Sequence, residues 1–244
     1  MSSSSALETK YRRLRIITIV VSCVAVFLGL VVAAQAASPA SRDTPGAGIE
    51  QGAPSEGSAV VRDDPDDPMA IGDPDAPITL VEWTDMRCPY CAVFNRDTMP
   101  VLIKEYVDSG KVRIEVNDVA FFGDQSRTAA VAVRAAGNQD MYFEYLSALY
   151  AAAPETGHPD LPRGQLIGFA EQIGIPDLER FTADLDDPEL AQQVETSTSF
   201  AQQIGITGVP AFVVNNQLIS GAQPIESFRQ FLDAELAKTS QAGQ

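Results

Sequence analysis

The stretch ITLVEWTDMRCPYC, residues 78–91, carries an apolar run directly into a pair of cysteines. The run at 78–83 predicts a buried strand, and the amphipathic sequence from Cys88 to about Asp108 predicts a helix kinked at Pro100. Two cysteines separated by two residues at a strand–helix junction are typical of a redox pair. The remaining sequence can be interpreted around this junction.

The expected position of Cys88, at the start of a helix, has a chemical consequence. Unpaired backbone N–H groups and the positive end of the helix dipole stabilise a thiolate at that position. The pKa of Cys88 should therefore be depressed, which makes Cys88 the nucleophile. Cys91 lies one turn further along, within reach for a disulfide, and Pro89 suits the first helical turn, where no N–H is needed.

Two structural interpretations of the cysteine pair stay open beside the redox one. A structural disulfide closing so short a loop restricts the unfolded chain little and tends to be strained. A zinc site needs about four ligands, but the other candidates are Cys23, in an apolar segment, and His158, the only histidine. We favour redox chemistry.

The charge of the chain is strongly acidic and unevenly distributed. Residues 1–37 carry a net charge of +3, so the remainder must carry −19 for the chain to reach its total of −16. A body this acidic repels phosphate, which argues against a nucleic-acid partner. Solubility is the simplest role for this charge.

The N-terminal residues predict a membrane anchor followed by a tether. Residues 1–15 form a basic tail expected on the cytoplasmic side, and 16–37 form an apolar transmembrane anchor, which places the following chain outside. A cleaved signal peptide with its site at 34–36 is the alternative. Cys23 loosely resembles a lipoprotein attachment site, but we interpret it as membrane-facing. Residues 38–70, rich in Pro, Gly, Ser and Asp, predict a flexible acidic linker.

The folded domain is expected over residues 71–238, with a tail at 239–244. A strand is expected at 111–119, a loop at 154–162, and two strands at 211–214 and 217–220, joined by a turn at Asn215 and Asn216. Helices are expected at 126–152, 165–173, 177–185, 188–204 and 225–237. Asp177 and Asp187 are candidate N-terminal caps.

This order of elements resembles the thioredoxin superfamily, specifically the DsbA-like thiol–disulfide oxidoreductases. The resemblance covers about residues 71–238. It rests on the CPYC tetrapeptide after a strand, on TGVP at 207–210 just before a strand, and on a helical insertion at about 126–204. The implied fold is an α/β thioredoxin fold with a helical insertion, preceded by one N-terminal transmembrane helix and a disordered tether.

The resemblance assigns roles to three residues around the cysteine pair. Cys88 matches the attacking cysteine and Cys91 the resolving one. Glu82 matches a buried acid beneath the site that relays a proton to the resolving cysteine. An acid on a buried strand is costly unless it has a task, although Glu82 could also be an exposed acid at a strand end.

The resemblance also assigns the residues that surround a substrate. Pro210 matches the family's cis-proline, whose loop faces the disulfide. Val209 would then offer its backbone to an extended substrate, as in strand addition, with Pro89 and Tyr90 flanking the same position. Tyr90 stands where the strongest oxidants of the family carry histidine, so the oxidising power of this chain is an open question.

The expected function is the introduction of disulfides into exported client proteins that carry free thiols. No cofactor beyond the Cys88–Cys91 disulfide and no metal is expected, and the family implies reoxidation by a quinone-linked membrane partner. The expected location is the cell membrane, single-pass, with the catalytic domain outside. The alternatives are a tethered reductase or isomerase, a copper-handling thiol module aided by Met86, and a purely structural scaffold.

Overall fold

The computed structural model describes residues 60–242 of the 244-residue chain. Its centre is a five-stranded sheet in the order β1-β3-β2-β4-β5. The strands are β1 (Ala70–Ile71), β2 (Ile78–Thr84), β3 (Val112–Asp118), β4 (Ala211–Val214) and β5 (Gln217–Ser220). Only β2 and β3 are parallel, whereas β1, β4 and β5 each run antiparallel to their neighbours. The four predicted strands are confirmed, and β1 is an addition.

The helix that follows β2 begins at Pro89, as the sequence predicts. It consists of α2 (Pro89–Val93), a π-helical segment η2 (Phe94–Thr98), α3 (Met99–Leu102) and a second π-helical segment η3 (Ile103–Val107). Pro100 is the second residue of α3, two positions after the end of η2. Proline has no backbone N–H to donate within a helix. Here the missing donor lies next to a wider π-helical turn, in which backbone groups pair five residues apart instead of four.

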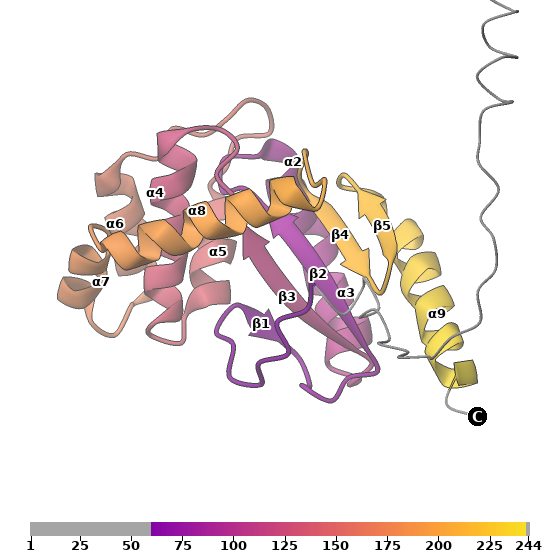
Figure 1. Ribbon diagram of the computed structural model, residues 1–244. Coiled ribbons are helices and arrows are strands. Elements are labelled where there is room, and N and C mark those ends of the chain that lie inside the picture. Colours follow the sequence, from indigo (N-terminus) through magenta and orange to yellow (C-terminus); the bar gives the residue numbers. More distant parts are fainter. Residues whose placement is uncertain (1–59, 243–244) are drawn as a thin grey trace, which may run out of the picture. The chain divides into compact units, whose positions relative to one another are not determined.

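A helical block lies between β3 and β4, where the insertion was expected, and covers one end of the sheet (Figure 1). Its helices are α4 (Asp124–Gly137), α5 (Tyr142–Ala151), α6 (Arg163–Ile173), α7 (Leu178–Asp184) and α8 (Pro188–Gln203). The single helix predicted at 126–152 is wrong, because the chain turns at Asp140, which has a φ of 60°. Asp177 and Asp187 are confirmed as caps, since each side chain accepts a backbone N–H of the following helix.

The predicted ends of the domain need correction on both sides. Residues 60–69, here called the N-terminal strap, pack on the sheet before β1, so the linker predicted at 38–70 is wrong for its last residues. Arg62 holds the strap: its backbone N–H donates to Glu115 at 2.8 Å and its side chain donates to Asp67 and Asn117. Such long-range bonds leave no local sequence signal.

At the other end, α9 (Ile225–Ala242) is longer than the predicted helix. The tail expected at 239–244 is therefore wrong for residues 239–242, where nothing before Gly243 interrupts a helix. Within residues 60–242 no helix combines the length and apolarity needed to cross a bilayer. The predicted anchor at 16–37, the basic tail and the first part of the linker lie outside the described residues.

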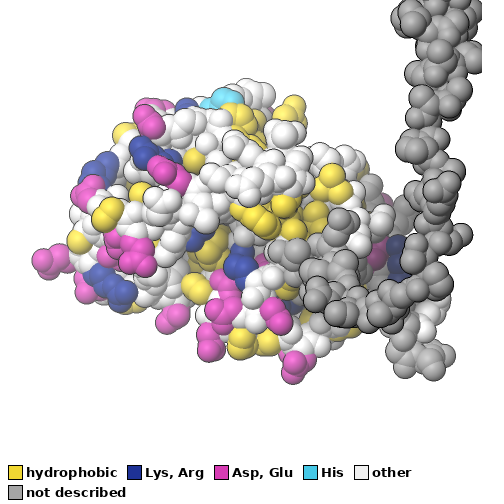
Figure 2. Space-filling model, viewed as in Figure 1, with side chains coloured by type: hydrophobic (Ala, Val, Ile, Leu, Met, Phe, Trp, Pro, Cys, Tyr) yellow, Lys and Arg dark blue, Asp and Glu magenta, His cyan; other side chains and the backbone are white. Residues whose placement is uncertain are grey.

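Strand β2 divides its side chains between two cores. Leu80 belongs to the larger core, formed with the redox helix and the helical block, whereas Val81 and Trp83 belong to a smaller core with residues of α8 and β4. Because side chains alternate along a strand, Glu82 and Thr84 face the larger core. Figure 2 shows acidic side chains spread over the helical block and hydrophobic ones gathered beside α8 and β4.

Candidate active site

Cys88 lies at the N-terminal cap of α2, directly after the turn that leaves β2. Its φ of −77° and ψ of 120° are extended, and helical geometry starts at Pro89. The side chain of Cys88 is 3% exposed, and that of Cys91, one turn into the helix, is fully buried. Both are free thiols in this structure. The predicted arrangement of the pair at a strand–helix junction is confirmed.

The loop before β4 brings the second predicted stretch to the first. The thiol of Cys88 donates to the carbonyl oxygen of Val209, with Sγ 3.4 Å from that oxygen and 121 residues separating the two in the chain. The peptide bond between Val209 and Pro210 is cis, as the resemblance implied. The cysteine pair and the Val209–Pro210 loop therefore form one site.

The pKa values of the two thiols are shifted in opposite directions. The hydrogen bond from the Cys91 thiol lowers the pKa of Cys88 most, and the backbone N–H groups of Cys91 and Tyr90 lower it further, against burial and the charge of Asp85. Burial raises the pKa of Cys91 well above its ordinary value, and the neighbouring Cys88 raises it further. Since the thiolate is the reactive form, these opposite shifts favour Cys88 as the nucleophile and keep the proton on Cys91.

Glu82 is buried on the same face of the sheet as this pair, with 2% of its surface exposed. Burial raises the pKa of Glu82 to about 8, although a hydrogen bond with Thr84 partly opposes the shift. Glu82 is therefore mostly protonated at neutral pH. Its Oε2 atom has no hydrogen-bond partner within residues 60–242. The prediction of a buried acid is confirmed, and the alternative of an exposed strand end is excluded.

The sequence did not identify Thr84 and Tyr150 as parts of the site. The two hydroxyl oxygens lie 2.7 Å apart, and the Tyr150 hydroxyl also donates to the Asp85 carbonyl at 3.1 Å. Thr84 hydrogen-bonds with Cys91 as well, which lowers the pKa of that thiol against the effect of burial. A buried tyrosine hydroxyl needs a hydrogen-bond partner. This general need is the only signal in the sequence that could have pointed to Tyr150.

Comparison with known proteins agrees with this geometry. The family model described as thioredoxin matches residues 64–234. The chain belongs to the thioredoxin family. It is 30% identical over 168 residues to disulfide bond formation protein D of Bacillus subtilis (strain 168), a match that covers 68% of this chain and 76% of that protein.

Two solved structures share the fold of this chain. Oxidised BdbD of Bacillus subtilis superposes with a TM-score of 0.65 at 29% identity, covering 69% of this chain and 92% of that one. The alpha-DsbA1 protein of Wolbachia pipientis gives a TM-score of 0.64 at 22% identity over 72% of this chain and 94% of that one, which shows the shared fold. The protein is a DsbA-like thiol–disulfide oxidoreductase.

A buried carboxylate that the sequence did not reveal holds the active-site turn of this oxidoreductase. Asp85 is fully buried. One carboxylate oxygen accepts hydrogen bonds from the backbone N–H of Arg87 at 2.8 Å and from the Ser126 hydroxyl at 2.7 Å. The other accepts from the backbone N–H groups of Phe121 and Phe122, at 2.7 and 3.3 Å. Burial raises the pKa of Asp85, whereas these bonds lower it. Asp85 ties the turn before Cys88 to the start of α4.

The loop predicted at 154–162 also reaches the active-site turn. The Arg87 guanidinium donates to the carbonyls of Pro159 and Phe122, both at 2.8 Å. The Nδ1 atom of His158 lies 2.9 Å from the Arg87 carbonyl oxygen, and its ring packs on Phe122 with centroids 4.1 Å apart. The helical block of the oxidoreductase thus supports the residue that precedes Cys88.

The outer side of the site is formed by Tyr90. Its side chain is 66% exposed, an unusual fraction for a large aromatic group, and Pro89 beside it is partly exposed. An exposed aromatic next to a reactive sulfur is a surface on which a bound chain can pack. Among residues 60–242, no three His, Cys, Asp or Glu side chains are grouped closely enough to hold a metal ion.

Proposed function

We propose that this oxidoreductase introduces disulfides into exported proteins by exchange at Cys88. The observation that supports this proposal best is the position of Cys88, at a helix N-terminus beside the Val209–Pro210 loop, with a thiolate that is stabilised while that of Cys91 is not. A stabilised thiolate is a good leaving group. The exchange equilibrium therefore favours an oxidised client and a free Cys88 thiolate over the mixed disulfide.

The reaction starts from the Cys88–Cys91 disulfide. A client thiolate attacks the Cys88 sulfur, the Cys88–Cys91 bond breaks, and Cys91 leaves as a thiolate that takes up a proton. A second client thiolate then attacks the client sulfur of the mixed disulfide and releases Cys88 as a thiolate. The client loses two electrons and the enzyme gains them. The sulfurs of the client end as a disulfide.

The client segment is expected to lie extended along the Val209–Pro210 loop. The carbonyl of Val209 accepts the thiol proton of Cys88 in the reduced form. In the disulfide form Cys88 has no such proton, so this carbonyl can accept a hydrogen bond from a chain that pairs beside the loop. Pro89 and Tyr90 flank the same position from α2. Recognition through backbone groups and one aromatic surface suits an enzyme with many clients.

Glu82 is expected to supply the proton that Cys91 needs. The carboxyl is buried on the Cys91 side of the sheet, and its raised pKa, about 8, leaves it protonated at neutral pH. Donation to a newly formed Cys91 thiolate makes Cys91 a better leaving group. Thr84, which hydrogen-bonds with both groups, connects them.

We further propose that residues 16–37 anchor the enzyme in the cell membrane, with residues 1–15 in the cytoplasm and the catalytic domain outside. Two electrons per client must leave the enzyme, and a quinone-linked membrane partner is the expected acceptor. An anchored domain stays close to such a partner. Accessibility of an engineered cysteine at residue 5 and of one at residue 240 to an impermeant reagent tests this topology.

The reduction potential of Cys88–Cys91 in the full chain tests the direction of electron flow. Equilibration in glutathione buffers, followed by thiol tagging, gives the potential directly. A value near the roughly −120 mV of a strong oxidant supports disulfide formation. A value near the roughly −270 mV of a thioredoxin-like reductant contradicts it and supports the tethered reductase.

A further inference from the structure

Two fully buried hydroxyl groups lie next to Cys91, one on the sheet and one on the helical block. Thr84 is the last residue of β2 and Tyr150 belongs to the final turn of α5, and neither side chain is exposed. Their oxygens lie 2.7 Å apart, a normal distance for a hydrogen bond between hydroxyls. Thr84 also hydrogen-bonds with the Cys91 side chain. The two hydroxyls, here called the hydroxyl chain, therefore lead to the sulfur of Cys91.

The hydrogens of the hydroxyl chain cannot serve every neighbour at once. Tyr150 has one hydrogen and two acceptors, the Thr84 oxygen at 2.7 Å and the Asp85 carbonyl at 3.1 Å. In one arrangement Tyr150 donates to Asp85 and Thr84 donates to Tyr150. In the other, Tyr150 donates to Thr84 and Thr84 donates to Cys91. Only the second arrangement directs a hydrogen at the sulfur.

The second arrangement leaves the Asp85 carbonyl with a partner. This carbonyl also accepts the backbone N–H of Cys88 at 2.9 Å. One good hydrogen bond is enough to satisfy a buried carbonyl, so the release of Tyr150 costs little. The two arrangements therefore differ only by rotation of two hydroxyl groups, and the turn before Cys88 is intact in both.

The charge of Cys91 selects between the two arrangements. A sulfur within a disulfide is neutral, whereas a departing Cys91 thiolate is a buried negative charge that needs hydrogen bonds in place of water. Burial raises the pKa of Cys91 most and the neighbouring Cys88 raises it further, while hydrogen bonds with the Thr84 side chain and the Asp85 backbone lower it. Thr84 is therefore the side chain that stabilises this thiolate.

Two nearby groups leave the Thr84 hydrogen available for this role. Glu82 also hydrogen-bonds with Thr84, but at neutral pH it is mostly protonated and brings a hydrogen of its own. Burial, and next the charge of Cys91, raises the pKa of Tyr150 well above its ordinary value, so Tyr150 keeps its hydrogen as well. Both neighbours can donate to the Thr84 oxygen.

Arg96, which follows α2 in the redox helix, holds α5 in this position. Its Nη1 atom donates to the carbonyls of Tyr150 and Ala153, at 2.9 and 3.2 Å. These carbonyls lie at or just beyond the C-terminal end of α5, where a cation also matches the negative end of the helix dipole. The helix that carries Cys91 and the helix that carries Tyr150 are therefore joined directly.

We propose that Thr84 is a catalytic residue that donates a hydrogen bond to the departing Cys91 sulfur, and that Tyr150 is the positioning residue that orients the Thr84 hydroxyl. As the client thiolate bonds to the Cys88 sulfur, the Cys88–Cys91 bond breaks and its electron pair goes to Cys91. The Thr84 hydrogen then rotates toward this sulfur, and the Tyr150 hydrogen rotates from the Asp85 carbonyl to the Thr84 oxygen. Each hydrogen stays on its own oxygen.

The inference rests on the proposed exchange at Cys88 and concerns its first step. In the second step the leaving sulfur belongs to Cys88, whose hydrogen bonds are made with Val209 and Cys91. A hydroxyl that accepts one hydrogen bond donates a stronger one, so Tyr150 strengthens the bond from Thr84 to Cys91. The hydroxyl chain should therefore speed opening of the disulfide and leave the reactivity of Cys88 unchanged.

Opening of the disulfide by excess dithiothreitol tests the hydroxyl chain in the full-length protein. Cys23→Ser in every variant leaves Cys88 and Cys91 as the only cysteines, and acid quenching followed by thiol tagging then measures the rate. Thr84→Val should slow opening about tenfold, because a hydrogen bond to a charged group is lost. Tyr150→Phe should slow it about threefold, because Thr84 stays in place but is no longer oriented.

The double variant Thr84→Val/Tyr150→Phe separates a chain of hydroxyls from two independent effects. If Tyr150 acts through Thr84, the double variant opens at the rate of Thr84→Val alone, because no hydroxyl is left to orient. Multiplied losses, about thirtyfold in all, overturn the proposal. An unchanged rate in Tyr150→Phe overturns it as well.

Tyr145→Phe is the matched control on the same helix. The Tyr145 hydroxyl is equally buried but donates to the Leu166 carbonyl at 2.8 Å. Its loss should lower stability and leave the rate of opening unchanged. Slowing equal to that of Tyr150→Phe would mean that any lost tyrosine hydroxyl on α5 has this effect, which overturns the proposal.

Alkylation of reduced Cys88 by iodoacetamide gives a second readout, since Cys91 does not leave in that reaction. Its rate should be unchanged in Tyr150→Phe. A loss equal to the loss in opening would show a displaced redox helix and overturn the proposal. Any thiol opens the disulfide, so a reducing potential would refute the proposed direction of electron flow without affecting this result.

Discussion

The Sγ of Cys88 lies 3.4 Å from the carbonyl oxygen of Val209, across the junction between the redox helix and the loop that begins β4. On the side of the loop, this contact places the reactive sulfur against a main-chain carbonyl. A thiol in this position is available to any extended chain that pairs with the loop.

The first prediction concerns the unequal roles of the two cysteines. Cys91→Ala should accumulate mixed disulfides with client proteins, because the thiol that reverses the intermediate is gone and Cys88 still reacts. Cys88→Ala should trap none, and its exchange activity should be lost. Non-reducing gels of each variant, with and without a reductant, give the measurement. Trapping by Cys88→Ala would contradict the assignment of the nucleophile.

The second prediction concerns the titration of the reduced enzyme. Cys88 should form a thiolate below the ordinary thiol pKa and Cys91 well above it, because the Cys91 thiol donates to Cys88 while burial disfavours a second charge. Thiolate absorbance against pH should therefore show one transition below pH 9 in the wild type. Because Cys91→Ala removes a stabilising hydrogen bond, its transition should lie at higher pH.

The third prediction concerns stability and the Glu82 carboxyl. Its pKa is raised from 4.5 to about 8 in the folded state, so the folded chain binds a proton that the unfolded chain releases between these values. The free energy of unfolding should fall as pH rises from about 5 to 8, by roughly 3–5 kcal/mol at most. Glu82→Gln should remove this slope. Urea unfolding of both reduced proteins at the two pH values measures it.

The fourth prediction concerns Asp85, whose charge raises the pKa of Cys88. Asp85→Asn should make the enzyme a stronger oxidant, because the Cys88 thiolate loses a negative neighbour. The same change should cost about 1–3 kcal/mol of stability, since an amide NH2 cannot accept the N–H groups of Phe121 and Phe122. Reduction potential and urea unfolding give both readouts.

Asp124→Asn is the control for that variant. Asp124 starts α4 near the same loop, but its side chain is 95% exposed. Neither the potential nor the stability should change by more than a small fraction of the Asp85→Asn effect. An unchanged potential in Asp85→Asn would show that its charge does not reach Cys88.

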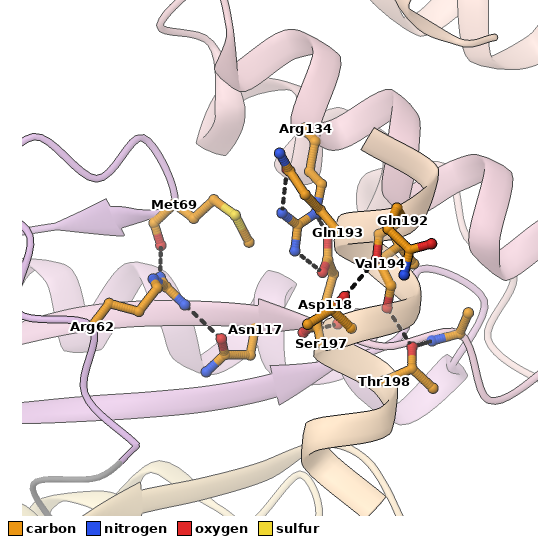
Figure 3. A network of polar contacts seen from close by, with 12 residues as sticks. Arg62, Met69, Asn117, Asp118, Arg134, Gln192, Gln193, Val194, Ser197 and Thr198 are labelled. Carbon is orange, nitrogen blue, oxygen red and sulfur yellow. Dashed lines mark hydrogen bonds and ion pairs between the residues drawn. The ribbon is translucent and has the colours of Figure 1, made fainter. Parts of the chain in front are cut away.

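The fifth prediction concerns the buried ion pair between Arg134 of α4 and Asp118 of β3 (Figure 3). Arg134 donates two short hydrogen bonds to Asp118, whose side chain is fully buried. Arg134→Met should destabilise the fold by about 3–5 kcal/mol, because it leaves a buried carboxylate without its partner. Arg127→Met, on the same helix, removes ion pairs of an exposed arginine and should cost under about 1 kcal/mol. Equal losses would contradict the burial argument.

Local patterns along the chain were enough to predict several parts of this protein. The strand before Cys88, the helix start at Pro89 and the strands β4 and β5 follow from alternation of apolar residues, from helix-terminus chemistry and from turn residues. The cis bond at Pro210 and the buried acid at Glu82 followed from the family resemblance. Each of these features has a signal within a few residues or in one recognisable tetrapeptide.

The contacts by which distant residues complete the site could not be predicted from local patterns. Thr84 meets Tyr150 across 66 residues, Asp85 meets Ser126 across 41, and Arg87 meets Pro159 across 72. A threonine, an aspartate and an arginine in a turn have many equally good local roles, so their sequence context cannot select these partners. Which pairs form depends on how the helical block packs against the sheet, and that packing is a property of the whole fold.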